Sequence, residues 1–428
     1  MTSSPTTSKD TPLPKSLRVV LAVVVALHLA LVFSVASAPL AVDARPPDPS
    51  RRSVLWPLYH DAVHRVGPAS DFFALYHAGA QVAQRDDPYG GRGRDPVTPY
   101  FFPYRYAPAL AFVAGPPLLG LAPATAWRLW IVALEALLAA VIVRLWRFAP
   151  TREVQVFTAL TLLLSTPYFL ELHMGQFTFA SVALVALALV GERVTSRAAA
   201  FSAAAFVKVF PLVAVPALVR ERAGRVVVVA AIALVVLTNG PLFLVDHALW
   251  QGFSRNFATQ TDGFNTGNFG FVYLVRLLGE ALSGPWGATT WAAVARVLQV
   301  VPLGVASVAA LRSQHRERVA LGGATLVVAH HLGYPHVWEH HMSAVLLMAL
   351  VMLASIVRAD GAWRRSSRVV AAAALVLALP TTFALDDPTG LSVYAPRVLL
   401  VACKALPVLA LFTVGVVELT RRRSEPSA

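Results

Sequence analysis

Long apolar runs recur along almost the whole chain, and this pattern restricts the possible folds more than any other feature of the sequence. Hydrophobic residues make up 57% of the 428 residues, whereas charged residues make up only 14%. A helix needs about 20 apolar residues to cross the hydrocarbon core of a bilayer, and several runs reach that length. The sequence therefore predicts an all-α polytopic membrane protein.

The positive net charge of +13 does not indicate nucleic-acid binding, because the basic residues gather at the ends of the apolar runs. That distribution is typical of the cytoplasmic loops of membrane proteins. No stretch joins a basic patch to stacking aromatic residues as in a soluble nucleic-acid-binding domain. The single cysteine, Cys403, lies in an apolar run, which excludes a disulfide framework and a cysteine-based metal site.

The domain organisation follows from the polar stretches. We predict a disordered cytoplasmic N-terminus at 1–16, one transmembrane domain at 17–420 and a cytoplasmic tail at 421–428. The first apolar run, 19–38, resembles a cleaved signal peptide, but it is longer than the 7–15 residues typical of one. We therefore interpret it as an uncleaved first span, followed by a long first extracytoplasmic loop at 41–105.

Clusters of arginine predict the topology. The clusters within 144–152, 193–197 and 220–225 should all be cytoplasmic. The segment 198–219 must then enter and leave on one side, as a broken helical hairpin with Lys208 and Pro211 at its tip. The proline-rich segment 106–123 should likewise dip into the membrane and return. The prediction is roughly twelve membrane-embedded helical segments, with both termini cytoplasmic.

This topology brings several polar groups to the outer face. One is Asp71, at the start of a helix-capable segment, where Ser70 or Asp71 could instead serve only as a helix N-cap. The others are Gln176, Lys208 and the loop from Asn265 to Asn268, together with the histidine tip, which we define as residues 330–341. For Lys208 the alternative is a lysine that snorkels at a helix break.

The histidine tip holds five of the twelve histidines and allows three interpretations. If Pro335 begins a helix, then His336, Glu339 and His340 match a zinc-hydrolase pattern, although no clear third ligand follows. The histidines and Trp338 would alternatively form an interfacial belt. The third interpretation is a polar site that handles an anionic or sugar group.

One acidic residue lies within a predicted span. Glu135 lies inside a predicted span, where an unpaired carboxylate is costly, so we predict that it pairs two helices.

A transporter would also have many spans, but its site usually lies at mid-bilayer between repeats. The polar groups gather instead at one face of a chain without an evident repeat, which favours an enzyme.

An ordered set of motifs resembles glycosyltransferase family 87. The motifs lie around Asp71 and Tyr76, at 87–89, 106–110, 175–176, 208–211, 265–268 and 338–341, so the resemblance covers nearly the whole chain. This family comprises multispanning enzymes of the GT-C class, bacterial α-(1→2)-mannosyltransferases that use polyprenyl-phosphate-mannose. The resemblance implies a GT-C-type bundle, a lipid-linked sugar donor and inversion at the anomeric carbon.

Within that reaction, each candidate residue has an expected role. A carboxylate should accept the proton of the acceptor hydroxyl, and Asp71 is the candidate base. Charge grows on the departing lipid phosphate, which cations and hydrogen-bond donors would stabilise. The candidates for binding the donor phosphate or sugar are Lys208, His340, His341, Gln176 and Tyr106. The candidates for the acceptor are Tyr76, Tyr89, Asn265 and Asn268.

The expected partners are polyprenyl-phosphate-mannose, a glycolipid acceptor and membrane lipids, without nucleic acid. No metal site is assigned and no cofactor is required, although the mechanism is compatible with a divalent metal. The expected location is the inner (plasma) membrane, as a multi-pass protein with its active site on the extracytoplasmic face.

Overall fold

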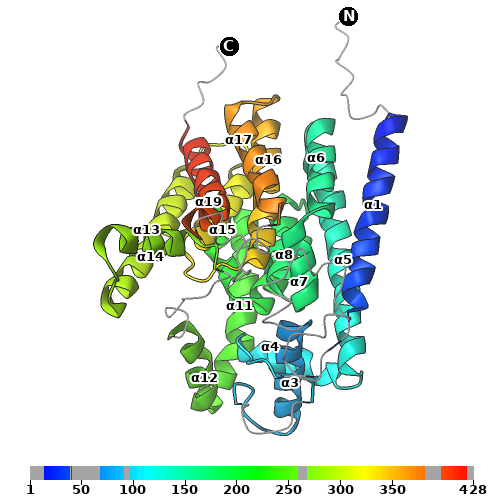
Figure 1. Ribbon diagram of the computed structural model, residues 1–428, viewed down its shortest axis with the longest axis vertical. Coiled ribbons are helices and arrows are strands. Elements are labelled where there is room, and N and C mark those ends of the chain that lie inside the picture. The colour runs from blue at the N-terminus through cyan, green and yellow to red at the C-terminus, as the bar shows by residue number, and fades with distance from the viewer. Residues whose placement is uncertain are drawn as a thin grey trace, which may run out of the picture.

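The computed structural model describes residues 14–38, 40, 68–90, 97–99, 101–258, 268–380 and 397–421. Within these ranges all regular elements are helices and no strand occurs (Figure 1). The all-α prediction is therefore confirmed for this part of the chain. The predicted N-terminal segment, most of the first loop, Asn265 and most of the C-terminal tail lie outside the described residues.

Six helices in the described part of the chain are long and apolar enough to cross a membrane. They are α1 (Lys15–Ala36), α5 (Pro123–Phe148), α11 (Arg222–Val245), α14 (Ala288–Arg312), α16 (Met342–Asp360) with the turn before it, and α19 (Arg397–Thr420). A bent pair, α6 (Arg152–Leu163) and α7 (Thr166–Met174), would make a seventh span. The structure thus supports a multi-pass membrane protein, whereas the count of twelve segments stays a prediction.

The bend between α6 and α7 has a local cause. Pro167 lies in the first turn of α7, where its missing N–H and fixed φ are tolerated, but it could not continue α6. The side chain of Ser165 caps the new helix by accepting a hydrogen bond of 3.4 Å from the backbone N–H of Tyr168. The two helices meet at an angle of 40°.

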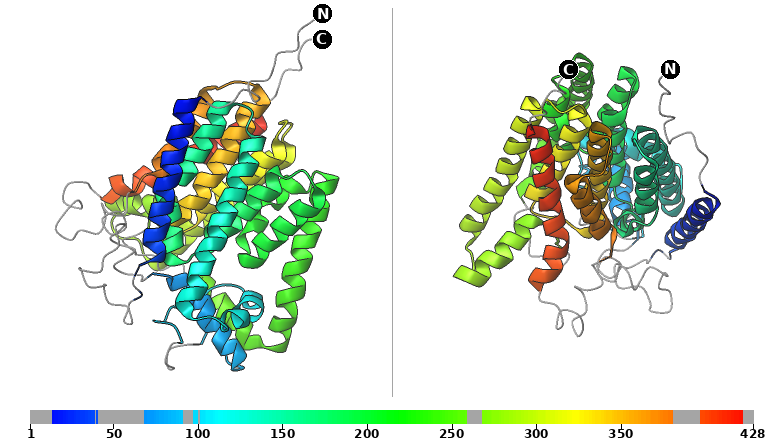
Figure 2. Two further views of the ribbon diagram at one scale, coloured as in Figure 1. Left: turned by 90° about the vertical axis from the view of Figure 1, so that its right-hand side faces the viewer. Right: turned by 90° about the horizontal axis from the view of Figure 1, so that it is seen from above.

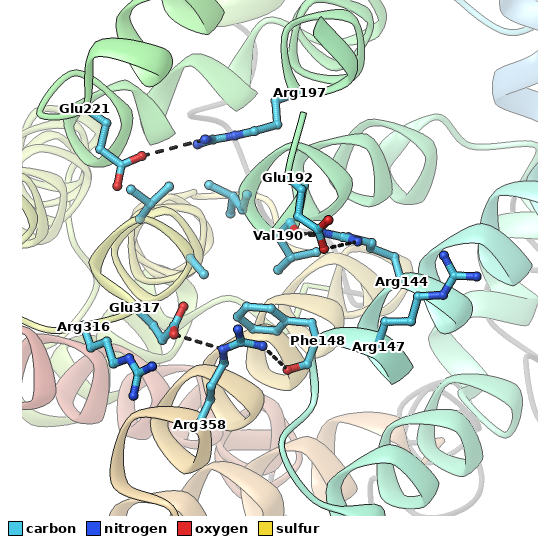
Figure 3. Close-up of a pocket in the computed structure, with 14 residues that line it drawn as sticks. Arg144, Arg147, Phe148, Val190, Glu192, Arg197, Glu221, Arg316, Glu317 and Arg358 are labelled. Carbon is cyan, nitrogen blue, oxygen red and sulfur yellow. Dashed lines mark hydrogen bonds and ion pairs between the residues drawn. The ribbon is translucent and has the colours of Figure 1, made fainter. Parts of the chain in front are cut away.

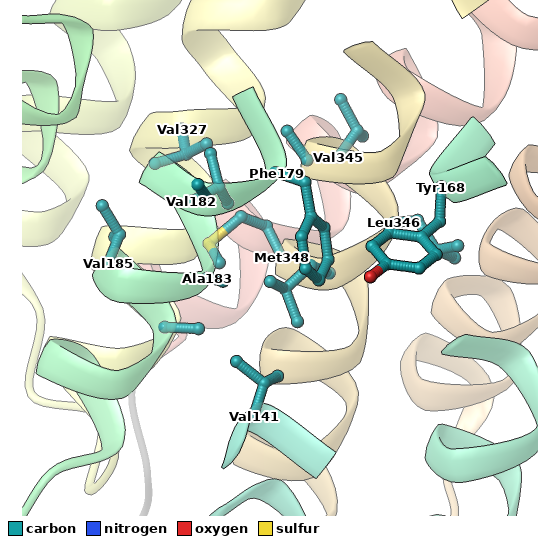
Figure 4. Packing of buried hydrophobic residues seen from close by; sticks show 14 of the residues in the cluster. Val141, Tyr168, Phe179, Val182, Ala183, Val185, Val327, Val345, Leu346 and Met348 are labelled. Atoms are coloured by element: carbon teal, nitrogen blue, oxygen red, sulfur yellow. The ribbon is translucent and has the colours of Figure 1, made fainter. Parts of the chain in front are cut away.

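The centre of the bundle consists of α8 (Thr178–Val190), α15 (Arg318–Gly333) and α16. Figure 4 shows Phe179 and Val182 of α8 packed beside Val345 and Met348 of α16. These helices are apolar on every side because protein surrounds them. The outer helices instead expose apolar side chains, as expected where lipid is the solvent; Val229 on α11 is 65% exposed.

The predicted broken hairpin is present. It runs through α9 (Val194–Val207), a break at Lys208, the 3₁₀ helix η3 (Phe210–Ala214) and α10 (Val215–Leu218). Arg197 near its start and Glu221 just after its end lie 3.7 Å apart. The chain therefore enters and leaves this hairpin at the same end of the bundle.

The arginine clusters also meet at that end, around a cavity of about 240 Å³ (Figure 3). Arg144, Arg197 and Arg358 each form an ion pair with a glutamate there and also donate to a backbone carbonyl. The beginning of α1 and the end of α19 lie at the same end of the bundle, at the top of Figure 1 and of the left view in Figure 2. We call this the arginine end.

The opposite end carries α3 (Ser70–Ala83), α4 (Pro108–Leu118) and α12 (His247–Ala258) (Figure 1). Helices α3 and α4 cross at Gly79 and Gly115, where a Cβ on Gly79 would lie 2.5 Å from the Gly115 backbone. With 11 residues and two internal prolines, α4 is too short to span, in line with the prediction for 106–123. Helix α12 was not predicted, because its sequence is polar on one side.

The prediction that Glu135 pairs two helices is confirmed. Its two carboxylate oxygens lie 2.8 Å from His28 Nε2 on α1 and 2.8 Å from the hydroxyl of Tyr168 on α7. The other imidazole nitrogen of His28 donates to the carbonyl of Leu163, also at 2.8 Å. One carboxylate thus connects three helices, α1, α5 and α7.

Candidate functional site

The start of α3 holds Asp71 in place without using its side chain as a cap. The N-cap residue is Ala69, in the left-handed region with φ of 63°, and no side chain caps the helix. The backbone N–H of Ala69 donates to the carbonyl of His173 at 2.7 Å, which fastens α3 to the end of α7. The alternative in which Ser70 or Asp71 serves only as a cap is therefore wrong.

A chain of polar contacts runs from Asp71 to Lys208. The Tyr106 hydroxyl lies 3.3 Å from Asp71 Oδ1 and 3.4 Å from Gln176 Oε1. The Lys208 ammonium lies 3.5 Å from the same Gln176 oxygen and donates to Thr178 Oγ1 at 2.5 Å. Four of the predicted site residues, from four separate segments of the chain, thus lie together.

Gly175 explains how α7 and α3 come so close. It ends α7 in the left-handed conformation, with φ of 64°. A Cβ at this position would lie 2.6 Å from Cβ of Phe72, the residue after Asp71. Only glycine satisfies both the backbone angle and the close approach, and the next residue, Gln176, is thereby directed to the site.

Two other tyrosines, Tyr89 and Tyr104, hold Tyr106 in position. The hydroxyl of Tyr89 donates to the Tyr106 carbonyl at 2.7 Å, and the ring of Tyr104 packs edge-on against the ring of Tyr106. The Lys208 ammonium lies 5.4 Å from the centroid of the Tyr106 ring. Tyr106 therefore contacts both the acid and the cation of the site.

Burial sets the protonation of this cluster. The carboxyl of Asp71 is only 7% exposed, and burial raises its pKa to about 6, against the opposing effect of the positive charges of Lys208 and Arg105. Burial, together with the negative charge of Asp71, raises the pKa of Tyr106 well above its ordinary value. At neutral pH Asp71 is thus ionised and is a stronger base than an exposed aspartate, while Tyr106 keeps its proton to donate.

The ammonium of Lys208 does not snorkel to the membrane interface but lies inside the protein. Lys208 lies at the break between α9 and η3, where the backbone turns extended, and its ammonium bonds to Gln176 and Thr178 inside the protein. Thr178 is the first residue of α8, so the positive end of that helix dipole also faces this position. The local field therefore favours an anion.

The histidine tip lies beside the hairpin. The ring of Phe210, two residues after Lys208, stacks on His330 with ring centroids 5.0 Å apart, and the rings of His340 and His341 are 4.1 Å apart. Nδ1 of His341 accepts a hydrogen bond of 3.0 Å from the backbone N–H of Trp338, so in the neutral ring Nε2 carries the proton. His340 is 2% exposed, and neither of its ring nitrogens has a hydrogen-bond partner within the described residues.

The zinc-hydrolase interpretation has no support. Pro335 does not begin a helix; residues 336–338 are not helical, and only Glu339–His341 form a short 3₁₀ turn, η5. His336 and His340 are therefore not one helical turn apart, and Glu339 faces Lys404 instead. Within the described ranges no three histidine, cysteine or acidic side chains are placed to hold a metal ion.

The residues predicted to bind the acceptor are not grouped around Asp71. Tyr76 donates to the Leu121 carbonyl at 2.8 Å, and Tyr89 supports Tyr106. Asn268 is fully buried, and its amide donates to the Pro335 carbonyl at 2.6 Å, which joins its segment to the histidine tip. Asn265 lies outside the described residues, and the acceptor roles of all four stay predictions.

The sequence reasoning missed Glu171. This residue of α7 is completely buried; Ser343 donates to Oε1 at 2.9 Å, and Oε2 has no partner among the described residues. Its backbone carbonyl accepts from the N–H of Gln176 at 3.0 Å, which places it directly behind the site. The signal was present, because a carboxylate inside an apolar run is costly and usually has a partner or a function.

Comparison with known families extends these observations. The family model of glycosyltransferase family 87 matches residues 104–335, more than half of the chain. The matched region contains Tyr106, Gln176 and Lys208, whereas Asp71 and His340 lie on either side of it. No curated protein matches the chain. With apolar helices long enough to span a membrane and a polar cluster built largely from the matched region, this chain belongs to glycosyltransferase family 87 and is a membrane glycosyltransferase.

Proposed function

We propose that this protein transfers mannose from a polyprenyl-phosphate donor to a glycolipid or other lipid-linked acceptor, with inversion of the anomeric carbon. The observation that carries the proposal is the polar chain from Asp71 through Tyr106 and Gln176 to Lys208. This chain of contacts holds the Asp71 carboxylate and the Lys208 ammonium near each other without a direct contact between them. A transfer with inversion needs a base for the attacking hydroxyl and a separate cation for the departing phosphate.

Asp71 is the base in this proposal. The acceptor hydroxyl attacks the anomeric carbon while its proton passes to the Asp71 carboxylate. The new bond joins the anomeric carbon to the acceptor oxygen. A buried carboxylate with a pKa raised to about 6 accepts a proton more readily than an exposed one and is still ionised at neutral pH.

Lys208 stabilises the leaving group in this proposal. The bond between the anomeric carbon and the phosphate oxygen breaks, and polyprenyl phosphate leaves with both electrons. The Lys208 ammonium, the N-terminal end of α8 and the Nε2–H of His341 are donors or positive ends suited to that charge. Gln176 and Tyr106 then orient the sugar between base and phosphate.

The site faces away from the arginine end, which supports an extracytoplasmic active site. Basic residues of short loops remain on the cytoplasmic side of a membrane, and five arginines, from the ends of three helices and one loop, line the cavity in Figure 3. Helix α3, which carries Asp71, lies at the opposite end of the bundle (Figure 1). In a bacterial cell this orientation corresponds to the plasma membrane with the reaction on its outer face.

The decisive experiment compares Asp71→Asn with the wild-type protein in detergent, using radiolabelled polyprenyl-phosphate-mannose. The amide cannot accept the proton, so the rate of transfer should fall by about 10²–10⁴ while the affinity for the donor changes little. Asp246→Asn, an exposed aspartate before α12, is the control and should keep the wild-type rate. A folded Asp71→Asn protein with near wild-type turnover would remove Asp71 from the mechanism. Absence of labelled glycolipid with wild-type membranes would reject this donor.

A further inference from the structure

A fully buried ion pair joins the last described helix to the histidine tip. The ammonium of Lys404 on α19 lies 3.4 Å from Oε1 of Glu339, the first residue of η5. The side chain of Lys404 is 0% exposed and that of Glu339 is 1% exposed. Neither residue belongs to the chain of contacts around Asp71.

Lys404 also ties down the end of a third helix. Its ammonium donates to the carbonyls of Val376 at 3.2 Å and Leu377 at 2.9 Å, and to the carbonyl of Leu379. These are the last carbonyls of α17 (Arg365–Ala378) and of the residue that follows it. A lysine at the negative end of a helix dipole is favourable, so Lys404 is well satisfied in this position.

Stability alone does not account for such a pair. Removing two charges from water costs several kcal/mol per ion, and well-packed apolar residues of similar size often stabilise a protein as much or more. An ionisable residue in an apolar span is rare and usually has a function or a specific partner. What the pair provides is a fixed geometry for the turn that contains Glu339.

The two residues that follow Glu339 are His340 and His341, whose rings lie against each other beside the Lys208 hairpin. The other end of the turn is fixed as well, because Ser343 donates to Glu171 of α7 at 2.9 Å. The turn η5 has only three residues and cannot hold its own shape. These two attachments hold the turn itself, while Asn268 holds the segment before it through the Pro335 carbonyl.

We propose that Lys404 and Glu339 form a positioning pair that fixes η5, so that His340 and His341 face the phosphate of the lipid donor. This inference rests on the proposed function. Lys404 and Glu339 contact neither the donor nor the reacting atoms; they act through the two histidines. Loss of the pair should therefore weaken binding of the lipid phosphate without affecting the acceptor.

The test compares Glu339→Gln, Lys404→Met and the double variant. Their affinity for polyprenyl phosphate alone, and the KM values for donor and acceptor, are measured in detergent. Each variant should bind polyprenyl phosphate about tenfold more weakly and show a similar rise in donor KM, with acceptor KM within about twofold of wild type. The double variant should be no worse than the poorer single variant, because both changes remove the same contact. It leaves no buried charge unpaired and so provides a folded protein if a single variant does not fold.

Glu135→Gln is the matched control, because Glu135 also forms a pair, with His28, but bonds to no residue of η5. It should keep wild-type affinity for polyprenyl phosphate even where its thermal stability is lower. A double variant that folds and binds polyprenyl phosphate as wild type does would overturn the inference. If the wild-type protein binds polyprenyl phosphate but transfers no sugar, the proposed reaction fails while the positioning role is still measured by binding.

Discussion

At the residue scale, the proposed reaction depends on the environment of one carboxyl group, that of Asp71. Burial alone would keep Asp71 protonated to a higher pH, whereas Lys208 and Arg105 favour its ionised form. The balance raises its pKa to about 6. An acid in this range is both ionised under physiological conditions and able to accept a proton in a transition state.

The first prediction concerns pH. Because the base must be ionised, the transfer rate should fall as the pH drops through about 6, the value to which burial raises the pKa of Asp71. Arg105→Gln removes a positive charge that lowers this pKa, so the acidic limb should move to higher pH. Arg128→Gln, which changes an exposed arginine that donates to the Ala36 carbonyl, should not move it. The measurement is the transfer rate between pH 4.5 and 8, and an unmoved limb in Arg105→Gln would contradict this account.

Sequence alone singles out Asp71, Gln176 and Lys208, since polar residues in apolar surroundings need partners and the family motif contains them. It does not predict Tyr106 as the bridge between acid and cation, because that depends on a loop conformation fixed by Tyr89. Glu171 was missed because it lies inside what looks like an ordinary span. The partner of Glu339 was missed for the same reason, since Lys404 stands far along the chain in an apolar run.

At the scale of the elements, the polar cluster lies where short helices end inside the bundle. An unbroken helix at these positions would have continued across the membrane. Helix α7 stops at Gly175, α9 stops at Lys208, and α8 begins between them at Thr178. Each break exposes polar backbone, which is tolerated at this depth only where protein surrounds it or water reaches it. The breaks thus define the site.

A glycine substitution tests this arrangement. Gly175→Ala adds a Cβ 2.6 Å from Phe72 in a residue whose φ is 64°. The left-handed conformation costs an alanine about 1–2 kcal/mol, and the crowding should add about 1–3 kcal/mol and displace α3 with Asp71. We expect a lower melting temperature and a transfer rate at least about tenfold lower.

Gly361→Ala is the matched control, because Gly361 also has a positive φ, of 72°, but no neighbouring atom within 4 Å of the added Cβ. It should lose stability from the backbone alone and keep its activity. Equal loss of activity in the two variants would show that the close approach of α7 and α3 is not what matters.

The sequence predicted the apolar helices well but their interruptions only in part. Proline and lysine marked the hairpin at 198–219, and the arginine clusters required it to return. The break at Ser165 was missed, since the run continues apolar on both sides of it. The helix after Pro335 that the zinc-hydrolase interpretation required does not form, because proline favours a first helical turn only when the following residues can continue it.

At the scale of the whole molecule, the bundle has two chemically different ends. One end gathers arginines that cap helix ends and pair with glutamates (Figure 3). The other carries α3, α4 and α12 (Figure 1). The charge rule for membrane proteins could predict this polarity from sequence, because it depends only on which loops are basic.

Thiol labelling tests the orientation. With Cys403 replaced by alanine, cysteines are introduced singly at Ser196, between the arginines at the start of α9, and at His247, at the start of α12; both residues are exposed. An impermeant thiol reagent added to intact cells should label position 247 and not position 196. Permeabilised cells should show labelling at both. Labelling of position 196 in intact cells would reverse the proposed orientation.

The order of synthesis decides when the pair between Glu339 and Lys404 can form. Glu339 leaves the ribosome well before Lys404, so during synthesis an acidic residue enters the bundle without its partner. One of the two attachments of the turn beside the site forms only when α19, the last described helix, packs against α17. A nascent chain that lacks this helix would already contain Asp71, Lys208 and both histidines. Such a chain would lack the ion pair that holds Glu339, so the turn with His340 and His341 would be the last part of the site to reach its final position.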